Sequence, residues 1–230
     1  MRNVYRETPR WTIVVRVFRN REDAGKQLAE KLLAEGVGGP DVKVLGIPRG
    51  GVVVAKSVSE ALGVQLDVVV SRKLRAPGNP ELGIGAVAEL DAVYINREIV
   101  DALGIGEDYI RSEVEYQRRV VASYVEKFRG TALDLRGFTA VVVDDGVATG
   151  ATVIAASIAA RKAGAEKVVV ATPVIARDVL GVVSRYADKV VAVTVPLILY
   201  AVGEFYRDFS EVTDSDVLRA LGRSPERRGG

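Results

Sequence analysis

Residues Thr139–Val153 read TAVVVDDGVATGATV. The apolar, β-branched run Ala140–Val143 is typical of a strand that is covered on both faces of a sheet. Asp144 and Asp145 follow where that strand should end, and burying an unpaired charge costs too much for either to be a core residue. We therefore expect both carboxylates to meet a cation, hydroxyl groups or water.

Small residues and two hydroxyl groups follow the acidic pair. The stretch Gly146–Thr152, GVATGAT, contains two glycines and two threonines. Such a loop gathers backbone N–H groups at the start of a helix, which favours a bound phosphate. Acids that can hold sugar hydroxyls or Mg²⁺, beside a phosphate cradle, indicate a phosphorylated sugar. The alternative is an ordinary doubly wound strand that ends in a polar turn.

The sequence VVVDDGVATGATV resembles the phosphoribosyl-pyrophosphate (PRPP) signature of the type I phosphoribosyltransferases. The resemblance implies that Asp144 and Asp145 hold the ribose 2- and 3-hydroxyls. It also implies that the 5-phosphate lies against the loop residues Ala148, Thr149, Gly150, Ala151 and Thr152.

One position departs from part of that family. Its enzymes for 6-oxopurines usually carry an Asp just before the Thr-Gly pair, where this chain has Ala148. A hypoxanthine or guanine acceptor is therefore not implied. A proton donor for the base would come from Glu81 or Glu89, or none is needed. The resemblance also covers YAVGEFYRDFSEVTD (Tyr200–Asp214) and points to a subgroup whose acceptor base is unassigned.

A second strand–turn–helix unit precedes the first. The predicted strand Val42–Ile47 leads through Pro48, Arg49, Gly50 and Gly51 into a predicted helix. The two glycines allow the backbone to approach an anion closely, and the Arg49 guanidinium suits phosphate oxygens. The alternative is a plain turn with an exposed arginine. GIPRGG resembles the family's pyrophosphate loop, whose backbone often carries a strained or cis peptide.

The stretch Ser71–Gly83 has no helix or strand period, and it carries three cations, Arg72, Lys73 and Arg75. Long irregular loops in compact domains are usually functional, so we expect a mobile lid that neutralises pyrophosphate. It resembles the family's flexible loop, and a solvated basic loop is the alternative. Gly83–Ala88 partly matches a dinucleotide fingerprint, but no strand precedes it. We predict that Ile84–Glu89 returns from the lid as a strand, paired with Ala92–Asn96.

Apolar and aromatic residues cluster in Pro196–Tyr206. One interpretation is a hood over the base site, in which Tyr200, Phe205 and Tyr206 stack on a planar ring. The other is part of the core followed by a C-terminal helix. That helix, Thr213–Leu221, is predicted from Thr213 as N-cap with an acid at capping-box spacing.

Strands and helices alternate along the whole chain, without a repeat or a linker. This pattern predicts an α/β fold with an open, mostly parallel, doubly wound sheet, a flexible lid and a C-terminal hood. We expect one domain over residues 1–230, with a core of about 20–195 and a hood of 196–222 joined by N-terminal residues. The other predicted strands are Trp11–Phe18, Leu66–Val70, Lys167–Thr172 and Lys189–Val193. The predicted helices are Arg19–Glu35 with Asn20 as N-cap, Val52–Leu62, Arg97–Phe128, Ala151–Ala163 and Ala176–Tyr186.

The composition limits which side chains are available for catalysis and metal binding. The 230 residues include no Cys and no His, which excludes disulfides, thiolates and His-based triads and leaves carboxylates with hard cations such as Mg²⁺. A net charge of +2 gives no support for nucleic-acid binding. The polar start and the lack of a long apolar run predict a cytoplasmic protein without a membrane segment. The single Met among many charges hints at a heat-adapted source.

The resemblance implies a pentosyltransferase, a glycosyltransferase that moves the phosphoribosyl group of PRPP to a nitrogenous base and releases pyrophosphate. It implies Mg²⁺, held by Asp144 and Asp145 directly or indirectly, and a homodimer. The alternative function is a non-catalytic regulator of the same fold that senses PRPP or nucleotides; the lid cations favour the enzyme. A phospho-receiver domain is rejected, because its acid pair lies near the chain start and Lys189–Val193 ends without an acid.

Overall fold

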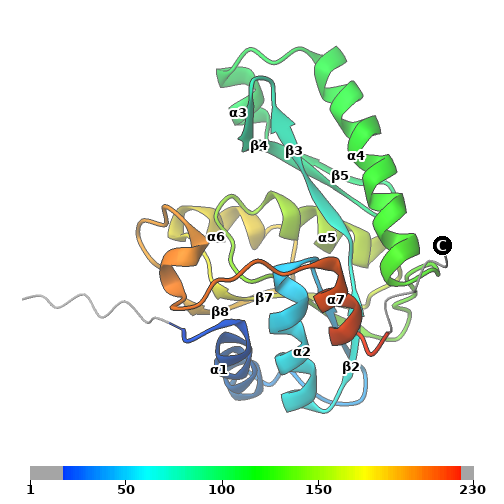
Figure 1. Cartoon of the computed structure of the whole chain (residues 1–230), viewed down its shortest axis with the longest axis vertical. Coiled ribbons are helices and arrows are strands. Elements are labelled where there is room, and N and C mark those ends of the chain that lie inside the picture. The colour runs from blue at the N-terminus through cyan, green and yellow to red at the C-terminus, as the bar shows by residue number, and fades with distance from the viewer. Residues whose placement is uncertain (1–17, 224–230) are drawn as a thin grey trace, which may run out of the picture.

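A parallel five-stranded sheet is the centre of the computed structural model, which describes residues 18–223 (Figure 1). Its strand order is β2-β1-β6-β7-β8. The strands are β1 (Val42–Gly46), β2 (Gln65–Val68), β6 (Thr139–Val143), β7 (Lys167–Val174) and β8 (Lys189–Thr194). The predicted open parallel α/β sheet is confirmed. The chain moves outward from β1 to β2 and then returns to the other side of β1, so the switch point of the sheet lies between β1 and β6.

Helices cover both faces of this sheet (Figure 1). The helices α1 (Arg21–Ala34) and α2 (Gly50–Leu62) share an apolar cluster with Val141 and Val143 of β6. The opposite face packs Ala140 and Val142 under α5 (Ala151–Lys162), with α6 (Arg177–Val183) beside it. Because successive side chains of a strand alternate between the faces, both sets must be apolar, which explains the unbroken run in β6.

The stretch predicted as an irregular lid is a β-hairpin, so the predicted irregular conformation is wrong, while its role as a lid stays a prediction. Residues of β3 (Ser71–Ala76) and β4 (Asn79–Ala88) pair antiparallel, with a register irregularity around Leu74–Ala76. The predicted pairing of the returning strand is confirmed, because β4 also pairs with β5 (Ala92–Ile95). The side chain of Leu74 is buried between charged neighbours, and this single apolar residue was too weak a signal for a strand.

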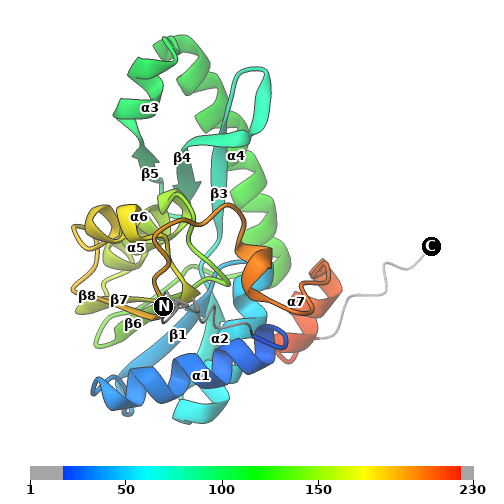
Figure 2. The same ribbon diagram turned by 90° about the vertical axis from the view of Figure 1, so that its left-hand side faces the viewer.

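The helices α3 (Arg97–Ala102) and α4 (Glu107–Phe128) follow β5. The sequence predicted one helix here, but Leu103–Gly106 interrupts it, with Gly104 at a φ of +62°. We call β3, β4, β5, α3 and α4 together the arm. It rises from one end of the sheet in Figures 1 and 2 and has an apolar cluster of its own, which includes Leu74, Ile84 and Phe128.

A buried ion pair joins the arm to the core. The guanidinium of Arg129, just after α4, meets the carboxylate of Glu89, just after β4, and both side chains are almost fully buried. The same Arg129 donates to the carbonyl of Val68 at 2.9 Å, and the Glu89 carboxylate accepts from the N–H of Val70 at 3.0 Å. These bonds hold the point where the chain leaves β2 for the arm.

The C-terminal hood segment, residues 196–222, contains the 3₁₀ turn η1 (Val202–Phe205) and α7 (Asp214–Ala220). It passes across the molecule between the arm and α1 (Figure 2). Phe18 forms a parallel bridge with Tyr206, and the rest of the predicted strand Trp11–Phe18 lies outside the described residues. The predicted N-cap Asn20 and the capping box of Thr213 are confirmed. Within residues 18–223, no helix is both long and apolar enough to cross a bilayer.

Candidate active site

The acidic pair lies at the carboxyl end of β6, in the middle of the sheet. Asp144 and Asp145 are partly buried, and the loop after them turns into α5 at Gly150, whose φ is +78°. Val147 fixes the loop against β7, because its N–H donates to Val174 and its carbonyl accepts from Ala176. Ala148 and Thr149 remain exposed at the tip. No side chain caps the N-terminus of α5, so its first N–H groups are suited to an anion.

The second glycine turn meets the acidic pair directly. Pro48–Gly51 follows β1, the neighbour of β6, and the peptide between Pro48 and Arg49 is cis. A Cβ on Gly51 would lie 2.7 Å from the carbonyl oxygen of Val143 and 2.9 Å from the Cα of Asp144. A Cβ on Gly50 would overlap the Asp145 carboxylate. Only glycine permits this approach, so the structure brings the two predicted turns together at the switch point.

The Arg49 guanidinium is held by the hood segment. Its Nη1 donates to the carbonyl of Val212 at 3.2 Å and to Glu211 Oε1 at 3.4 Å, and its Nε lies 3.6 Å from Asp214 Oδ1. The Arg49 side chain is 37% exposed, so these acids screen its charge only partly. An anion that enters the turn would compete with them for the guanidinium.

Arg21 is a site residue that the sequence did not reveal. Its Nε donates to Asp145 Oδ2 at 2.8 Å, across 124 positions of chain. Arg21 is the first residue of α1, and the sequence showed it only as a charge on a helix end. The hydroxyl of Tyr206 donates to the backbone carbonyl of Asp145 at 2.6 Å. No local pattern could have indicated either contact, because both depend on the hood segment and α1 closing around the turn.

Burial dominates the electrostatics of the acidic pair. It raises the pKa of Asp144 well above its usual range, and the neighbouring charge of Asp145 adds to this effect. Burial also raises the pKa of Asp145, although the Arg21 guanidinium opposes the rise. Asp144 Oδ1 accepts from the N–H of Asp145 at 2.9 Å, but Oδ2 has only a long 3.4 Å contact with the Thr152 hydroxyl. The pair is short of positive charge and of donors, which a cation or sugar hydroxyls would supply.

The predicted lid cations lie in the arm. Arg75 Nε donates to Glu113 Oε1 of α4 at 2.9 Å, and the Arg72 guanidinium lies 5.6 Å from the ring centroid of Tyr124. Lys73 Nζ donates across the hairpin to the carbonyl of Glu81 at 2.7 Å. Among residues 18–223, no hydrogen bond or ion pair joins these three cations to the acidic pair or to Pro48–Gly51.

Strand alternation distinguishes Lys73 from the two arginines. Ser71 begins β3 and donates its hydroxyl to the carbonyl of Thr152 in α5, so its side chain faces the loop of residues 148–152. Lys73 is two residues further and therefore leaves the strand on the same face as Ser71. Arg72 and Arg75 instead contact α4 on the other side of the arm, since a register shift just before Arg75 breaks the alternation there.

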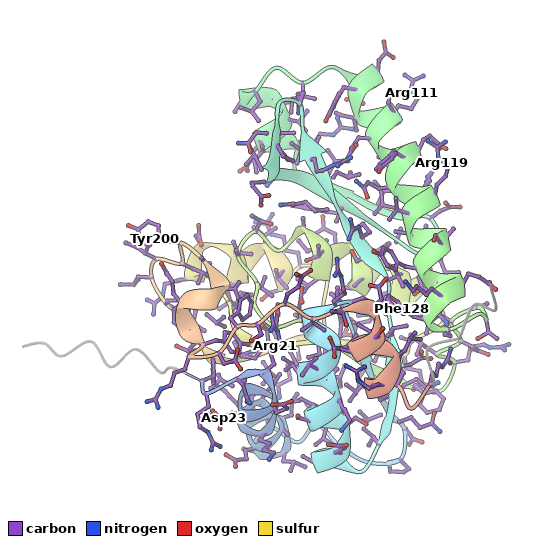
Figure 3. The ribbon with its side chains drawn as sticks, in the orientation of Figure 1. Arg21, Asp23, Arg111, Arg119, Phe128 and Tyr200 are labelled. Atoms are coloured by element: carbon purple, nitrogen blue, oxygen red, sulfur yellow. The ribbon has the colours of Figure 1, made fainter. Side chains whose placement is uncertain are left out.

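Two of the residues predicted to stack on the base are buried in the hood segment, so those two predictions are wrong. Phe205 and Tyr206 are each 6% exposed and pack in a cluster with Phe18 and Val174, so neither ring can stack on a base. Tyr200 is 83% exposed and projects from the outer end of the hood segment (Figure 3). It is the one predicted stacking residue whose ring faces are open.

The two suggested proton donors, Glu81 and Glu89, differ in their exposure to solvent. Glu89 is committed to the buried pair with Arg129, which excludes it as a proton donor to a base. Glu81 is 94% exposed on the hairpin, and its Oε2 lies 3.8 Å from Lys73 Nζ. The only suggested donor left in contact with solvent is therefore Glu81.

Comparison with known proteins agrees with this geometry. A phosphoribosyl transferase domain family matches residues 16–209. Two curated proteins, from Mycobacterium tuberculosis strains CDC 1551 and H37Rv, are provisionally named phosphoribosyl transferases, and each is 41% identical over 217 residues. These matches cover 91% of this chain but 47% of each relative, so the chain spans about half of their length.

A solved structure is similar to this chain over nearly its whole length. The crystal structure of TT1426 from Thermus thermophilus is 42% identical to this chain, with a TM-score of 0.71. The match covers 89% of this chain and 97% of that one. The family match, the order of the elements in the fold and the meeting of the two turns all agree: this chain belongs to the phosphoribosyl transferase domain family.

Proposed function

We propose that this protein transfers the 5-phosphoribosyl group of PRPP to a nitrogenous base and releases pyrophosphate. The observation that carries the proposal is the contact between the glycine turn Pro48–Gly51 and the acidic pair at the switch point of the sheet. Gly50 and Gly51 pack directly on Asp145 and Asp144. PRPP carries a pyrophosphate and a 5-phosphate on one ribose, so a single molecule would fit both turns and the acidic pair between them.

The transfer breaks the bond between C1 of the ribose and a pyrophosphate oxygen, and the electron pair leaves with pyrophosphate. A ring nitrogen of the base forms the new bond to C1 and then loses its proton to solvent. Positive charge develops on the sugar in between, so catalysis depends on positioning and electrostatics. Asp144 and Asp145 hold the ribose hydroxyls and offer negative charge to the ring. The exposed loop residues Ala148 and Thr149, with the start of α5, hold the 5-phosphate.

Mg²⁺ fits this site. Asp144 and Asp145 would hold the ion, directly or through water, and the ion would stabilise the charge of the departing pyrophosphate. Residues 18–223 contain no cluster of three or more side chains that could bind a metal. One or two carboxylates completed by substrate oxygens are the usual arrangement for this ion. Burial raises the pKa of both carboxyl groups, so a cation beside them would stabilise their charged form.

The cations have separate roles in the proposal. Arg49 exchanges Glu211 for pyrophosphate when PRPP binds. Lys73 is the arm cation on the face of β3 that meets the loop of residues 148–152. It is therefore the arm cation that we expect to bind pyrophosphate together with Arg49. Tyr200 offers an open ring to the base at the outer end of the hood segment.

The test is pyrophosphate release when the protein, PRPP and Mg²⁺ are incubated with a panel of purine and pyrimidine bases. Release with at least one base, lost in Asp145→Asn, is the expected result. PRPP or nucleotide binding without release for any base would favour the non-catalytic regulator instead. If calorimetry detected no binding of PRPP at all, both functions would be wrong.

A further inference from the structure

Arg21 connects three separate parts of the site. Its Nε donates to Asp145 Oδ2, and its Nη1 donates to the backbone carbonyl of Ser210 in the hood segment, both at 2.8 Å. The guanidinium carbon lies 3.9 Å from the ring centroid of Phe209. The side chain is only 11% exposed. Figure 3 shows Arg21 between α1 and the hood segment.

An aromatic chain leads to this guanidinium. Phe18 lies 5.3 Å from Tyr206, and Tyr206 lies 4.9 Å from Phe209, measured between ring centroids. Tyr206 in turn donates its hydroxyl to the carbonyl of Asp145. The hood segment therefore contacts the backbone of Asp145 directly through Tyr206. It also positions the Asp145 carboxylate indirectly, because it holds the Arg21 guanidinium that binds that carboxylate. Such charge-assisted and ring contacts hold a guanidinium in one orientation.

The Asp145 carboxylate is consequently confined on two sides. Gly50 packs against it, and a Cβ there would also come within 2.9 Å of Arg21 Nε. On the side of α1, the Arg21 guanidinium donates a hydrogen bond to Oδ2. The position of the other oxygen, Oδ1, is then fixed relative to the phosphate loop, because a carboxylate is planar and rigid.

We infer that Arg21 is a positioning residue for sugar recognition, which aims the Asp145 carboxylate at one ribose hydroxyl. The inference rests on the proposed function, in which Asp144 and Asp145 hold the ribose. A site that accepts a hydrogen bond from a substrate hydroxyl discriminates against an analogue without that hydroxyl, because the analogue leaves the acceptor of the site unpaired. The discrimination depends on the orientation of the Asp145 carboxylate, so it should depend on Arg21, which acts through Asp145.

A purely structural role for Arg21 predicts a different result. If Arg21 only stabilised the fold, its loss would weaken the binding of all three sugar phosphates by one common factor or leave all three affinities unchanged. The ratio between ribose 5-phosphate and its deoxy analogues would then stay constant. That ratio separates the two roles, because the phosphate contacts are the same in all three ligands.

The experiment measures, by calorimetry with Mg²⁺ present, the binding of ribose 5-phosphate, 2-deoxyribose 5-phosphate and 3-deoxyribose 5-phosphate. Wild type should prefer ribose 5-phosphate to at least one deoxy analogue by about tenfold or more. Arg21→Gln should bring that ratio close to one, and Arg21→Lys should restore part of it. Arg19→Gln is the matched control, because Arg19 also pairs with an aspartate near the start of α1 but is 74% exposed.

An unchanged ratio in a folded Arg21→Gln protein would overturn the inference while leaving the proposed function intact. Failure of the wild type to bind any of the three ligands would instead count against the proposed function. If Arg21→Gln does not fold, Phe209→Leu carries the test, since it removes the ring beside the guanidinium but keeps both charges. A ratio equal to that of the wild type in Phe209→Leu and in Arg21→Lys would then refute the inference.

Discussion

The hydroxyl of Tyr206 donates a hydrogen bond to the backbone carbonyl of Asp145 at 2.6 Å, across 61 positions of chain. Burial raises the pKa of this phenol, with the charge of Asp145 adding to the effect, so the hydroxyl stays protonated and remains a donor. The bond ties the hood segment to the turn that carries the acidic pair.

Tyr206→Phe should therefore lower the free energy of unfolding by about 1 kcal/mol, because a partly buried carbonyl loses its donor. Urea denaturation monitored by circular dichroism measures the difference. Tyr200→Phe is the control, since that side chain is 83% exposed, and it should leave stability unchanged. Equal stability of wild type and Tyr206→Phe would mean that the hydrogen bond contributes nothing.

Asp144→Asn should flatten the pH dependence of stability. The pKa of Asp144 is raised in the folded state, so folding takes up a proton, and stability falls as pH rises from the unfolded pKa of about 4 toward the folded value. The amide removes this loss, so the variant should be more stable than wild type at pH 7 while PRPP binding disappears. Denaturation curves between pH 4 and 8 give the comparison.

A suitable contrast is Asp134→Asn. The Arg136 side chain lowers the pKa of Asp134 to about 2, so this carboxylate stabilises the fold above its unfolded pKa and loses that contribution as pH falls. Its removal should therefore lower stability by a constant amount above the unfolded pKa, and the difference from wild type should disappear as pH falls toward the folded pKa. Parallel pH curves for wild type and Asp144→Asn would contradict the assigned pKa shift.

Gly51→Ala should abolish PRPP binding, because the added methyl group would lie 2.7 Å from the carbonyl of Val143 and push the glycine turn away from the acidic pair. Calorimetry with PRPP and Mg²⁺ is the measurement. Gly181→Ala provides the control, since nothing lies within 4 Å of a Cβ at that helical position. It should bind normally and gain up to about 1 kcal/mol of stability from helix propensity.

Arg129→Met should lower the free energy of unfolding by about 3 kcal/mol or more, because it leaves the Glu89 carboxylate buried without its partner. The same change in the exposed pair, Arg136→Met, should cost far less, because water already solvates both charges. Guanidinium denaturation of both variants tests the difference. Similar losses in the two would show that the buried pair does not hold the arm.

The sequence was sufficient for the sheet and for the two turns, because each depends on local patterns. The β-branched run Ala140–Val143 favours a buried strand, and Gly50 and Gly51 mark a tight turn through local backbone freedom alone. The hairpin Ser71–Ala88 depends instead on pairing across its strands, and its charges conceal the alternation. The aromatic pair Phe205–Tyr206 looked available to a ligand because burial against Phe18 is a long-range property.

The turn of the β3–β4 hairpin, around Pro77-Gly78, is exposed at the end of the arm, and the chain contains no cysteine. Asn79→Cys would therefore create a single thiol for site-directed labelling, at a place where a dye disturbs little packing. The emission spectrum of an environment-sensitive label attached there would report whether the hairpin end changes its surroundings when PRPP is added.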